Sequence, residues 1–291
     1  MKAFIFSGQG SQIVGMGKTL CNLSDTSMEY LEIADDILGY KLSDLMFEGT
    51  KQQLKETKIT QPAVFVYSVI KARITRDFKP EMVAGHSLGE FSALSAVRAI
   101  KYADALRLVA KRGELMQAAC EANPSTMAAV LGLDDAIIES ICASIEEEVV
   151  VPANYNYPGQ LVISGSLKGI EIASEKLKEA GARNVLKLRV GGAFHSPLME
   201  SAKEELAKAI EATTFREPPC PVYQNVTGTA TQDPEELKAN LIEHLTSPVR
   251  WTTIIENMAE EGARTFIEVG PRPILTNMVK KINDRISAEV L

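Results

Sequence analysis

Histidine and cysteine are scarce in this sequence, and it has no apolar run long enough to cross a bilayer. Three histidines and four cysteines occur among 291 residues. No two cysteines form a C-x-x-C pair, so we expect buried free thiols rather than disulfides. The first apolar run, residues 3–6, leads into a glycine loop and is too short for the core of a signal peptide. These absences predict a cytoplasmic protein without a membrane segment.

The sequence also has fewer basic than acidic residues. The net charge is -7, which argues against a general nucleic-acid binder, because such proteins are normally basic. A dinucleotide-binding fingerprint is missing as well, since G-x-G-x-x-G starting at Gly8 would need a small residue where Ile13 stands. The sequence therefore favours neither nucleic acid nor a dinucleotide as its ligand.

The composition that remains is that of a globular protein, with 45% hydrophobic and 24% charged residues. The length suits one large domain with a smaller one inserted. Residues 3–6, 81–84 and 266–269 read as strands, 64–70 (after Pro62), 102–119 and 197–212 as helices, and 221–226 as extended chain. In the middle we expect strands 127–131, 149–152, 161–164 and 185–188 and helices 134–146 and 170–179. That β-α-β-β-α-β order is ferredoxin-like. We predict an α/β chain with a large domain (1–124 and 190–291) and an inserted ferredoxin-like small domain (125–189).

The strongest motif is Gly85-His86-Ser87-Leu88-Gly89, which matches the G-x-S-x-G nucleophile elbow. It stands between a predicted strand and a predicted helix, where a sharp turn would expose the serine hydroxyl. The amide of Leu88, at the helix start, could then donate to a developing oxyanion. The alternative is that Ser87 is only a helix cap. We predict a catalytic serine in an α/β-hydrolase-like parallel-sheet domain.

A serine nucleophile needs a base, and the choice is among three histidines. His86 is adjacent to Ser87, and neighbouring side chains of an elbow point in different directions. His195 lies in a loop at the return from the inserted unit, where catalytic groups tend to occur. His244 lies on a predicted helix between two leucines. The pattern favours His195 over His244.

Arg112 is the other informative residue, because it falls on the apolar stripe of the predicted helix 102–119. A buried charge is costly unless something pairs with it. One reading is a structural salt bridge to an internal carboxylate. The other is a socket for a substrate carboxylate, which the guanidinium fork can bind with two hydrogen bonds. The sequence leaves both open.

Taken together, the motifs resemble the malonyl-CoA:acyl carrier protein transacylase family, related to the acyltransferase domains of fatty acid and polyketide synthases. The matching blocks are Phe6–Gln12, Gly85–Glu90, Lys111–Gly113, Asn154 with Pro158–Gln160, Phe194–Met199, Asn225–Gly228, Pro248–Trp251 and Glu268–Pro271. Three sites depart from the family pattern, and one of them, His244, is described below. Ser7 replaces a proline, and Arg272-Pro273 replaces a more flexible pair.

The resemblance implies that Ser87 takes the malonyl group and His195 acts as its base. It places the amides of Gln9 and Leu88 in the oxyanion hole and pairs Arg112 with the malonyl carboxylate. It also assigns Asn154 and Phe194 to substrate binding, the phenylalanine being typical of malonyl-selective members. His244 stands where the family usually has a glutamine that helps to orient the catalytic histidine, partly through its backbone carbonyl.

The resemblance further implies two partners, malonyl-CoA and acyl carrier protein, and a supply of malonyl groups to fatty acid biosynthesis. It implies no metal and no redox cofactor, and we expect a monomer. Both partners are acidic, so an acidic enzyme would need a local basic patch. Two rivals remain: a serine hydrolase with the same elbow, whose acidic third residue could be Glu171 or Glu175, and a docking module without catalysis.

Overall fold

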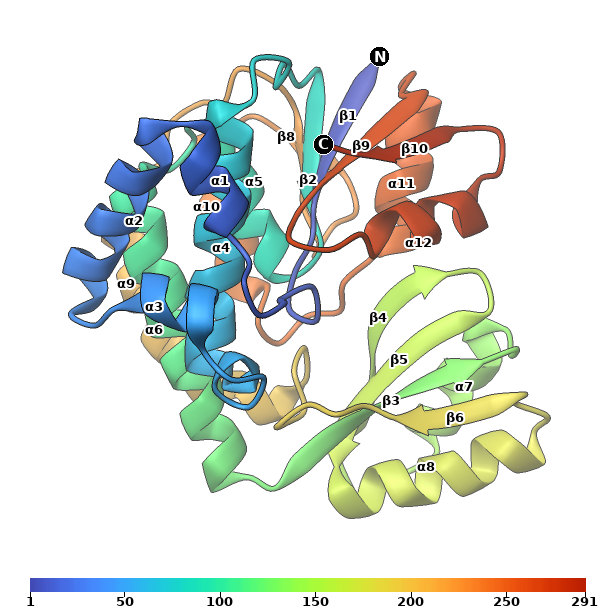
Figure 1. Cartoon of the computed structure of the whole chain (residues 1–291). Coiled ribbons are helices and arrows are strands. Elements are labelled where there is room, and N and C mark those ends of the chain that lie inside the picture. The colour runs from blue at the N-terminus through green and yellow to red at the C-terminus, as the bar shows by residue number, and fades with distance from the viewer.

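Two β-sheets organise the chain, which the computed structural model describes over all 291 residues (Figure 1). The larger sheet has six strands in the order β10-β9-β1-β2-β7-β8, parallel except for the β7–β8 pair. Its strands are β1 (Lys2–Phe6), β2 (Met82–Gly85), β7 (Val222–Tyr223), β8 (Ala230–Thr231), β9 (Thr265–Val269) and β10 (Ser287–Val290). The sheet therefore joins both ends of the chain.

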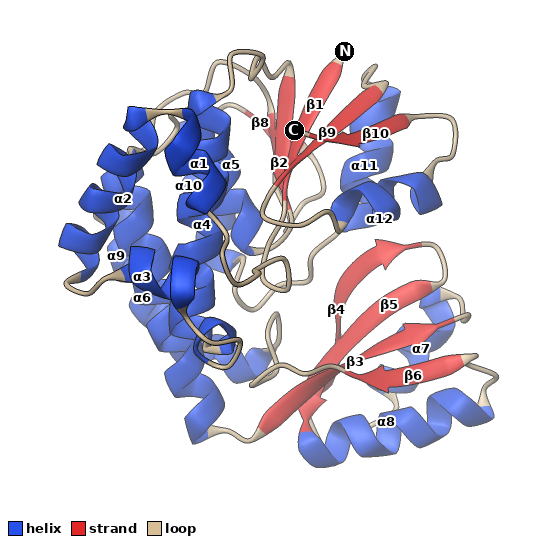
Figure 2. Ribbon diagram, in the orientation of Figure 1, coloured by secondary structure: helices blue, strands red, loops and turns tan.

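Helices cover both faces of this sheet (Figure 2). One layer comprises α1 (Lys18–Leu23), α2 (Asp25–Leu38), α3 (Leu42–Glu48), α4 (Thr57–Ile74), α5 (Leu88–Ala96), α6 (Tyr102–Ala122), α9 (Glu200–Glu211) and α10 (Pro234–Glu243), with single turns η1 (Gln53–Lys55) and η2 (Pro197–Met199). The other comprises α11 (Trp251–Glu260) and α12 (Leu275–Ile282). Along β1, Phe4 and Phe6 pack into the first layer, whereas Ala3 and Ile5 pack into the second. Because both faces are buried, the strand reads as an unbroken apolar run.

The smaller sheet is antiparallel, with strand order β4-β5-β3-β6. Its strands are β3 (Ser125–Leu131), β4 (Val150–Tyr157), β5 (Gln160–Ser166) and β6 (Asn184–Lys187), and its helices are α7 (Asp135–Ala143) and α8 (Leu167–Glu179). Ala128 and Val130 of β3 pack with these two helices, while Met127 and Ala129 join the main core. This alternation fixes one face of the sheet against the rest of the molecule.

The carboxyl ends of the parallel strands face the smaller sheet (Figure 1). Strand β4 also reaches the larger unit directly, because Ala153 accepts a hydrogen bond from the amide of Val249 at 2.8 Å and the amide of Tyr155 donates to the Val249 carbonyl at 2.9 Å. In open parallel sheets, sites form outside the carboxyl ends of the strands. The architecture therefore directs attention to the loops between the two sheets.

Most predicted elements are confirmed, but several boundaries were wrong. Helix α4 begins at Thr57, so Pro62 lies inside it rather than in its first turn. The polar-looking residues 57–61 hid this start, although Thr57, Thr60 and Gln61 are buried. The helix expected at 197–212 begins as the separate turn η2. Only two residues of the extended stretch 221–226 pair as a strand.

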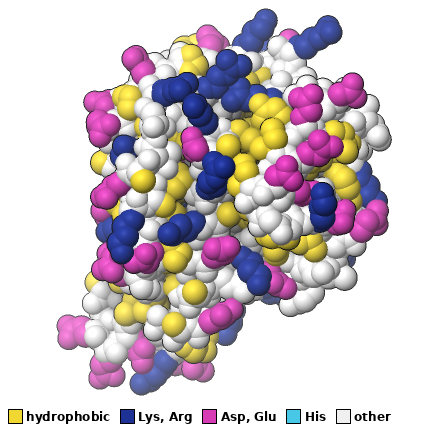
Figure 3. Space-filling model, turned by 90° about the vertical axis from the view of Figure 1, so that its left-hand side faces the viewer, with side chains coloured by type: hydrophobic (Ala, Val, Ile, Leu, Met, Phe, Trp, Pro, Cys, Tyr) yellow, Lys and Arg dark blue, Asp and Glu magenta, His cyan; other side chains and the backbone are white.

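Cysteine burial was predicted only in part. All four thiols are free, but Cys21 and Cys120 are partly exposed, whereas Cys142 and Cys220 are buried. No helix is both long and apolar enough to span a membrane. The face in Figure 3 carries acidic and basic side chains interspersed, and no histidine is visible on it. His195 and His244 are buried, and His86 is half-buried.

Candidate active site

Ser87 occupies a strained turn between β2 and α5. Its φ of 52° lies in the left-handed region, which is uncommon for a residue other than glycine. Two glycines make the turn possible. A side chain on Gly85 would collide with the backbone of Gly89, and one on Gly89 would collide with the carbonyl of Phe6. The predicted order of strand, tight turn and helix around Ser87 is present.

His195 meets Ser87 across this turn. Its Nε2 lies 2.8 Å from the Ser87 hydroxyl oxygen, and only 3% of the residue is exposed. The backbone of His195 is left-handed too, with φ 56°. The loop that holds it is fastened at Ala193, whose amide donates to the Ser125 hydroxyl at 3.0 Å. Of the three histidines, the structure brings the favoured one to the serine.

Two backbone carbonyls fix the other nitrogen of His195. Nδ1 lies 3.1 Å from the carbonyl oxygen of His244 and 3.0 Å from that of Ser247. Carbonyls only accept, so Nδ1 carries the hydrogen and Nε2 is free to accept the proton of Ser87. Burial, reinforced by the positive charge of Arg112, lowers the pKa of His195 to about 3, so the ring is neutral at physiological pH.

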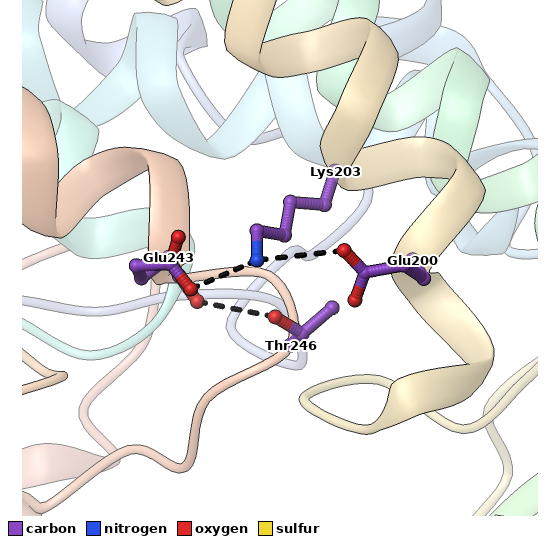
Figure 4. A network of polar contacts seen from close by, with 4 residues as sticks. All are labelled: Glu200, Lys203, Glu243 and Thr246. Carbon is purple, nitrogen blue, oxygen red and sulfur yellow. Dashed lines mark hydrogen bonds and ion pairs between the residues drawn. The ribbon is translucent and has the colours of Figure 1, made fainter.

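The turn that supplies these carbonyls begins where α10 ends. His244 therefore caps the helix rather than lying on it, which corrects the prediction. Lys203 on α9 contacts this turn, because its Nζ lies 2.8 Å from the Glu243 carboxylate and 3.4 Å from that of Glu200 (Figure 4). Within the turn, the Thr246 hydroxyl donates to the Glu243 carbonyl at 3.5 Å. Because η2 connects the His195 loop to α9, these contacts link the segment that carries the base to the turn whose carbonyls orient it.

Arg112 is fully buried, as its place on the apolar stripe of α6 predicts. Its Nη2 donates to the Ser87 hydroxyl at 3.2 Å, its Nη1 donates to the side-chain oxygen of Gln61, and its Nε is buried without a partner. Burial lowers the pKa of Arg112 to about 9, although the negative charge of Glu90 acts to raise it. The guanidinium is therefore positive near neutral pH. Arg112 makes no ion pair with a carboxylate, so the structural salt bridge that the sequence left open is not seen.

Gln61 is a site residue that the sequence reasoning missed. Besides accepting from Arg112, it donates to the side-chain oxygen of Gln9 at 3.0 Å. It thereby ties the guanidinium to the first glycine loop. The sequence could have indicated it, because Gln61 is a polar residue within the apolar helix α4 and is buried. The same mismatch between a polar residue and an apolar helix drew attention to Arg112.

The amides expected in an oxyanion hole are available. The backbone nitrogens of Gln9 and Leu88 donate to no other group in the structure. The first glycine loop closely approaches the elbow, since a side chain on Gly8 would strike the carbonyl of His86. Two free amides beside a nucleophile can receive the charge of an acyl oxygen.

The remaining predicted residues lie around this centre with less direct contacts. Phe194 is buried next to His195. Asn154 is buried on β4, but its side chain makes no hydrogen bond, and its backbone pairs with Val249 instead. It is Asn156 that reaches the elbow, 2.9 Å from Nε2 of His86. The contact with Asn156 turns His86 away from Ser87, in agreement with its rejection as the base.

Basic side chains gather at a cleft of about 620 Å³ that the first glycine loop forms with residues 51–55 and 189–191. Gln9 and Gly10 of the first glycine loop form part of its wall. Four of the other lining residues are cations: Lys51, Lys55, Arg189 and Arg272. The guanidinium of Arg272 donates to the Gly10 carbonyl at 2.6 Å, which binds this cation to the loop. A chain of net charge -7 thus has a positive cleft at the glycine loop that approaches the elbow.

Comparison with known proteins agrees with this geometry. A family model described as the acyl transferase domain matches residues 3–289. The malonyl CoA-acyl carrier protein transacylase of Bacillus subtilis (strain 168) is 42% identical over 291 residues, spanning 98% of this chain and 91% of that protein. The protein of the same name from Staphylococcus aureus (strain MRSA252) is 39% identical over 97% of this chain and 92% of its own length.

Solved structures show the same fold. The crystal structure of an acyl carrier protein S-malonyltransferase from Vibrio cholerae has a TM-score of 0.96 at 40% identity, covering 100% of this chain and 96% of that one. A malonyl-transacylase in complex with a type II PKS acyl-carrier protein has a TM-score of 0.95 at 37% identity, covering 100% and 95%. The chain is a mixed α/β protein that belongs to the acyl transferase domain family and, within it, to the malonyl-CoA:acyl carrier protein transacylases.

Proposed function

We propose that this chain transfers the malonyl group of malonyl-CoA to the phosphopantetheine thiol of acyl carrier protein through a malonyl ester on Ser87, and so supplies fatty acid biosynthesis. One observation carries the proposal. The Ser87 hydroxyl lies 2.8 Å from the His195 base and 3.2 Å from the Arg112 guanidinium. The base and a cation that can bind a carboxylate therefore both contact the hydroxyl oxygen of the nucleophile. The two substrates are taken from the names of the relatives.

In the first half of the reaction, the Ser87 oxygen attacks the thioester carbonyl while His195 Nε2 takes its proton. Negative charge then develops on the carbonyl oxygen, which the amides of Gln9 and Leu88 stabilise. The imidazolium returns its proton to the departing thiolate of coenzyme A. The carbonyls of His244 and Ser247 hold Nδ1–H throughout, which keeps Nε2 aimed at the serine.

Arg112 selects the acyl group. Its Nη2 already faces the nucleophile and its Nε lacks a partner, so the fork has donors to offer a carboxylate near Ser87. Phe194 fills space beside the α-carbon of the acyl group and so favours malonyl over bulkier units. Asn154 shapes the pocket from the side of the smaller sheet.

In the second half, the thiol of the phosphopantetheine arm attacks the malonyl-serine, and His195 takes the thiol proton. The cleft lined by Lys51, Lys55, Arg189 and Arg272 suits both acidic partners, because positive charge there steers anions toward the glycine loop. This cleft is the local basic patch that the net charge of the chain demands.

A serine hydrolase is the rival chemistry, and the third group of the site argues against it. His195 Nδ1 faces two backbone carbonyls, where hydrolases of this kind have a carboxylate. Glu171 and Glu175, the acidic candidates, lie exposed on α8 of the smaller unit. A docking module without catalysis is disfavoured because the nucleophile and base are in hydrogen-bond contact.

The choice of acceptor tests this function. Malonyl-enzyme mixed with acyl carrier protein bearing phosphopantetheine is expected to pass on its malonyl group on the order of 100-fold faster than it releases free malonate to water. Acyl carrier protein without the arm is the matched control and should accept nothing. The measurement is malonyl-carrier mass and free malonate over time. Release of malonate that keeps pace with transfer would identify a hydrolase.

The acid side of the pH profile should be flat. Only neutral His195 can act as a base, and its pKa of about 3 keeps it neutral far below the ordinary histidine range. We expect the rate of malonyl-enzyme formation to stay within about threefold between pH 8 and pH 5, whereas a base with an ordinary pKa would lose about 30-fold. A rapid-quench series measures this, with folding checked at each pH because the unfolded chain binds protons that the folded one does not.

A second buried group requires a control in that series. Burial raises the pKa of Glu90 to about 7, so it can titrate inside the measured range. Glu90→Gln, which cannot titrate, should leave the profile flat. A 30-fold fall centred near pH 6.5 in both proteins would contradict the assignment of a buried, neutral His195.

Three further features complete the proposal. The element order of residues 125–189 and the sheet order β4-β5-β3-β6 support a ferredoxin-like domain inserted into an α/β-hydrolase-like one formed by 1–124 and 190–291.

The reaction draws on no metal or redox cofactor, because serine, imidazole and thioester account for every bond and proton. One chain supplies every residue of the site, so the proposed monomer needs no second copy for catalysis.

A further inference from the structure

Asn225 lies at the centre of the site, although the reaction assigns it no part. Its backbone amide donates to the Glu90 carboxylate at 2.7 Å, and the residue has no exposed surface. It follows β7 and begins the turn that leads to β8, so it stands at the carboxyl edge of the large sheet beside the elbow. Its side chain makes three hydrogen bonds there.

Those bonds reach both sides of the catalytic pair. The side-chain oxygen accepts from the amide of Ser87 at 2.7 Å and lies 3.2 Å from Nε2 of His244. The side-chain nitrogen donates to the carbonyl of Gly85 at 2.6 Å. Asn225 therefore spans the strained turn from Gly85 to Ser87 and binds the residue whose carbonyl orients His195.

The orientation of this amide is determined by its surroundings. If oxygen and nitrogen were exchanged, two N–H donors would face each other at Ser87, and two oxygens would face each other at Gly85. With the orientation seen, His244 must carry its hydrogen on Nε2 to donate to the shared oxygen. Because the bonds to Gly85 and His244 are buried, losing either leaves an unpaired polar group, which is costly.

We propose that Asn225 is a positioning residue for acyl transfer, whose single side-chain oxygen sets the nucleophile turn and the His244 carbonyl relative to each other. The inference rests on the proposed function. It adds that the distance between Ser87 and His195 is maintained by a side chain that touches neither reacting atom. The carboxylate of Glu90 anchors Asn225 from behind and is itself bound by Gln224 at 3.1 Å.

Asn225→Ala is expected to lower kcat for malonyl transfer by on the order of 10- to 100-fold, because displacements near 1 Å between reacting groups have effects of that size. The KM for malonyl-CoA should change by less than about threefold, since Asn225 does not line the cleft. Water admitted around the loosened ring should also raise the apparent pKa of His195, so that an acid limb enters the profile between pH 5 and pH 7.

A second pair of variants avoids removing the buried asparagine. His244→Gln and His244→Leu both keep the backbone carbonyl, but only glutamine can donate to the Asn225 oxygen. We expect His244→Gln within about threefold of the unchanged enzyme and His244→Leu about tenfold lower in kcat. Equal rates in this pair, or an Asn225→Ala enzyme with unchanged kcat and pH profile, would overturn the inference. If the unchanged protein formed no malonyl-serine at all, the proposed function would fail instead.

Discussion

Replacing Ser87 with alanine is expected to lower malonyl transfer by on the order of 10⁵- to 10⁶-fold, as the loss of a serine nucleophile does in enzymes that depend on one. The reason is chemical, because no other hydroxyl in the structure lies in contact with the His195 base. The loss should appear in kcat. Binding of malonyl-CoA should survive, because the basic cleft and Arg112 remain. Steady-state transfer to acyl carrier protein, together with ligand binding by calorimetry, measures both quantities.

The matched control is Ser92→Ala, on the helix α5 that Ser87 caps. Ser92 is fully buried, and its hydroxyl has no hydrogen-bond partner. We expect it to transfer malonyl within about twofold of the unchanged protein. Residual transfer above one part in a thousand by Ser87→Ala would show that another group accepts the malonyl group.

The second large effect concerns selectivity and follows from the buried Arg112. Arg112→Ala should reduce malonyl transfer by on the order of 100-fold or more, because removing one member of a buried charged pair costs roughly 2–5 kcal/mol. Acetyl transfer should suffer much less, or rise, because an acetyl group brings no carboxylate to be matched. The readout is the ratio of kcat/KM for malonyl-CoA to that for acetyl-CoA.

A control on the same helix separates this role from general damage. Arg107 is exposed on α6 and pairs with Asp104. Arg107→Ala should leave the malonyl-to-acetyl ratio unchanged. Equal losses for the two acyl groups in Arg112→Ala would count against a carboxylate socket and favour a purely structural role.

The sequence predicted the parts of the site that local patterns encode. The elbow was readable because glycines on both sides of Ser87 are required where backbones nearly touch, and no other residue fits there. Arg112 could be recognised because a charged residue on the apolar stripe of a helix is unusual and indicates a special role. The β-α-β-β-α-β order of the middle segment was likewise visible, since strand and helix periodicities differ.

What the sequence could not show depends on contacts between distant residues. Asn225 and Ser87 are 138 positions apart, and nothing local marks the hydrogen bond between them. The carbonyl of Ser247 is invisible for the same reason, because every residue has a carbonyl. The left-handed backbone of His195 also escaped notice, since it is imposed by the loop on both sides rather than by the residue.

The most direct measurement of the central claim is where the malonyl group rests between the two substrates. The protein is mixed with malonyl-CoA alone, quenched, digested and mapped by mass spectrometry. The account predicts one malonyl group on the peptide that contains Ser87, and its disappearance within a single turnover when acyl carrier protein with its arm is added. Transfer that proceeds while this peptide stays unmodified, or a malonyl group on any other residue that discharges at the rate of turnover, would contradict it.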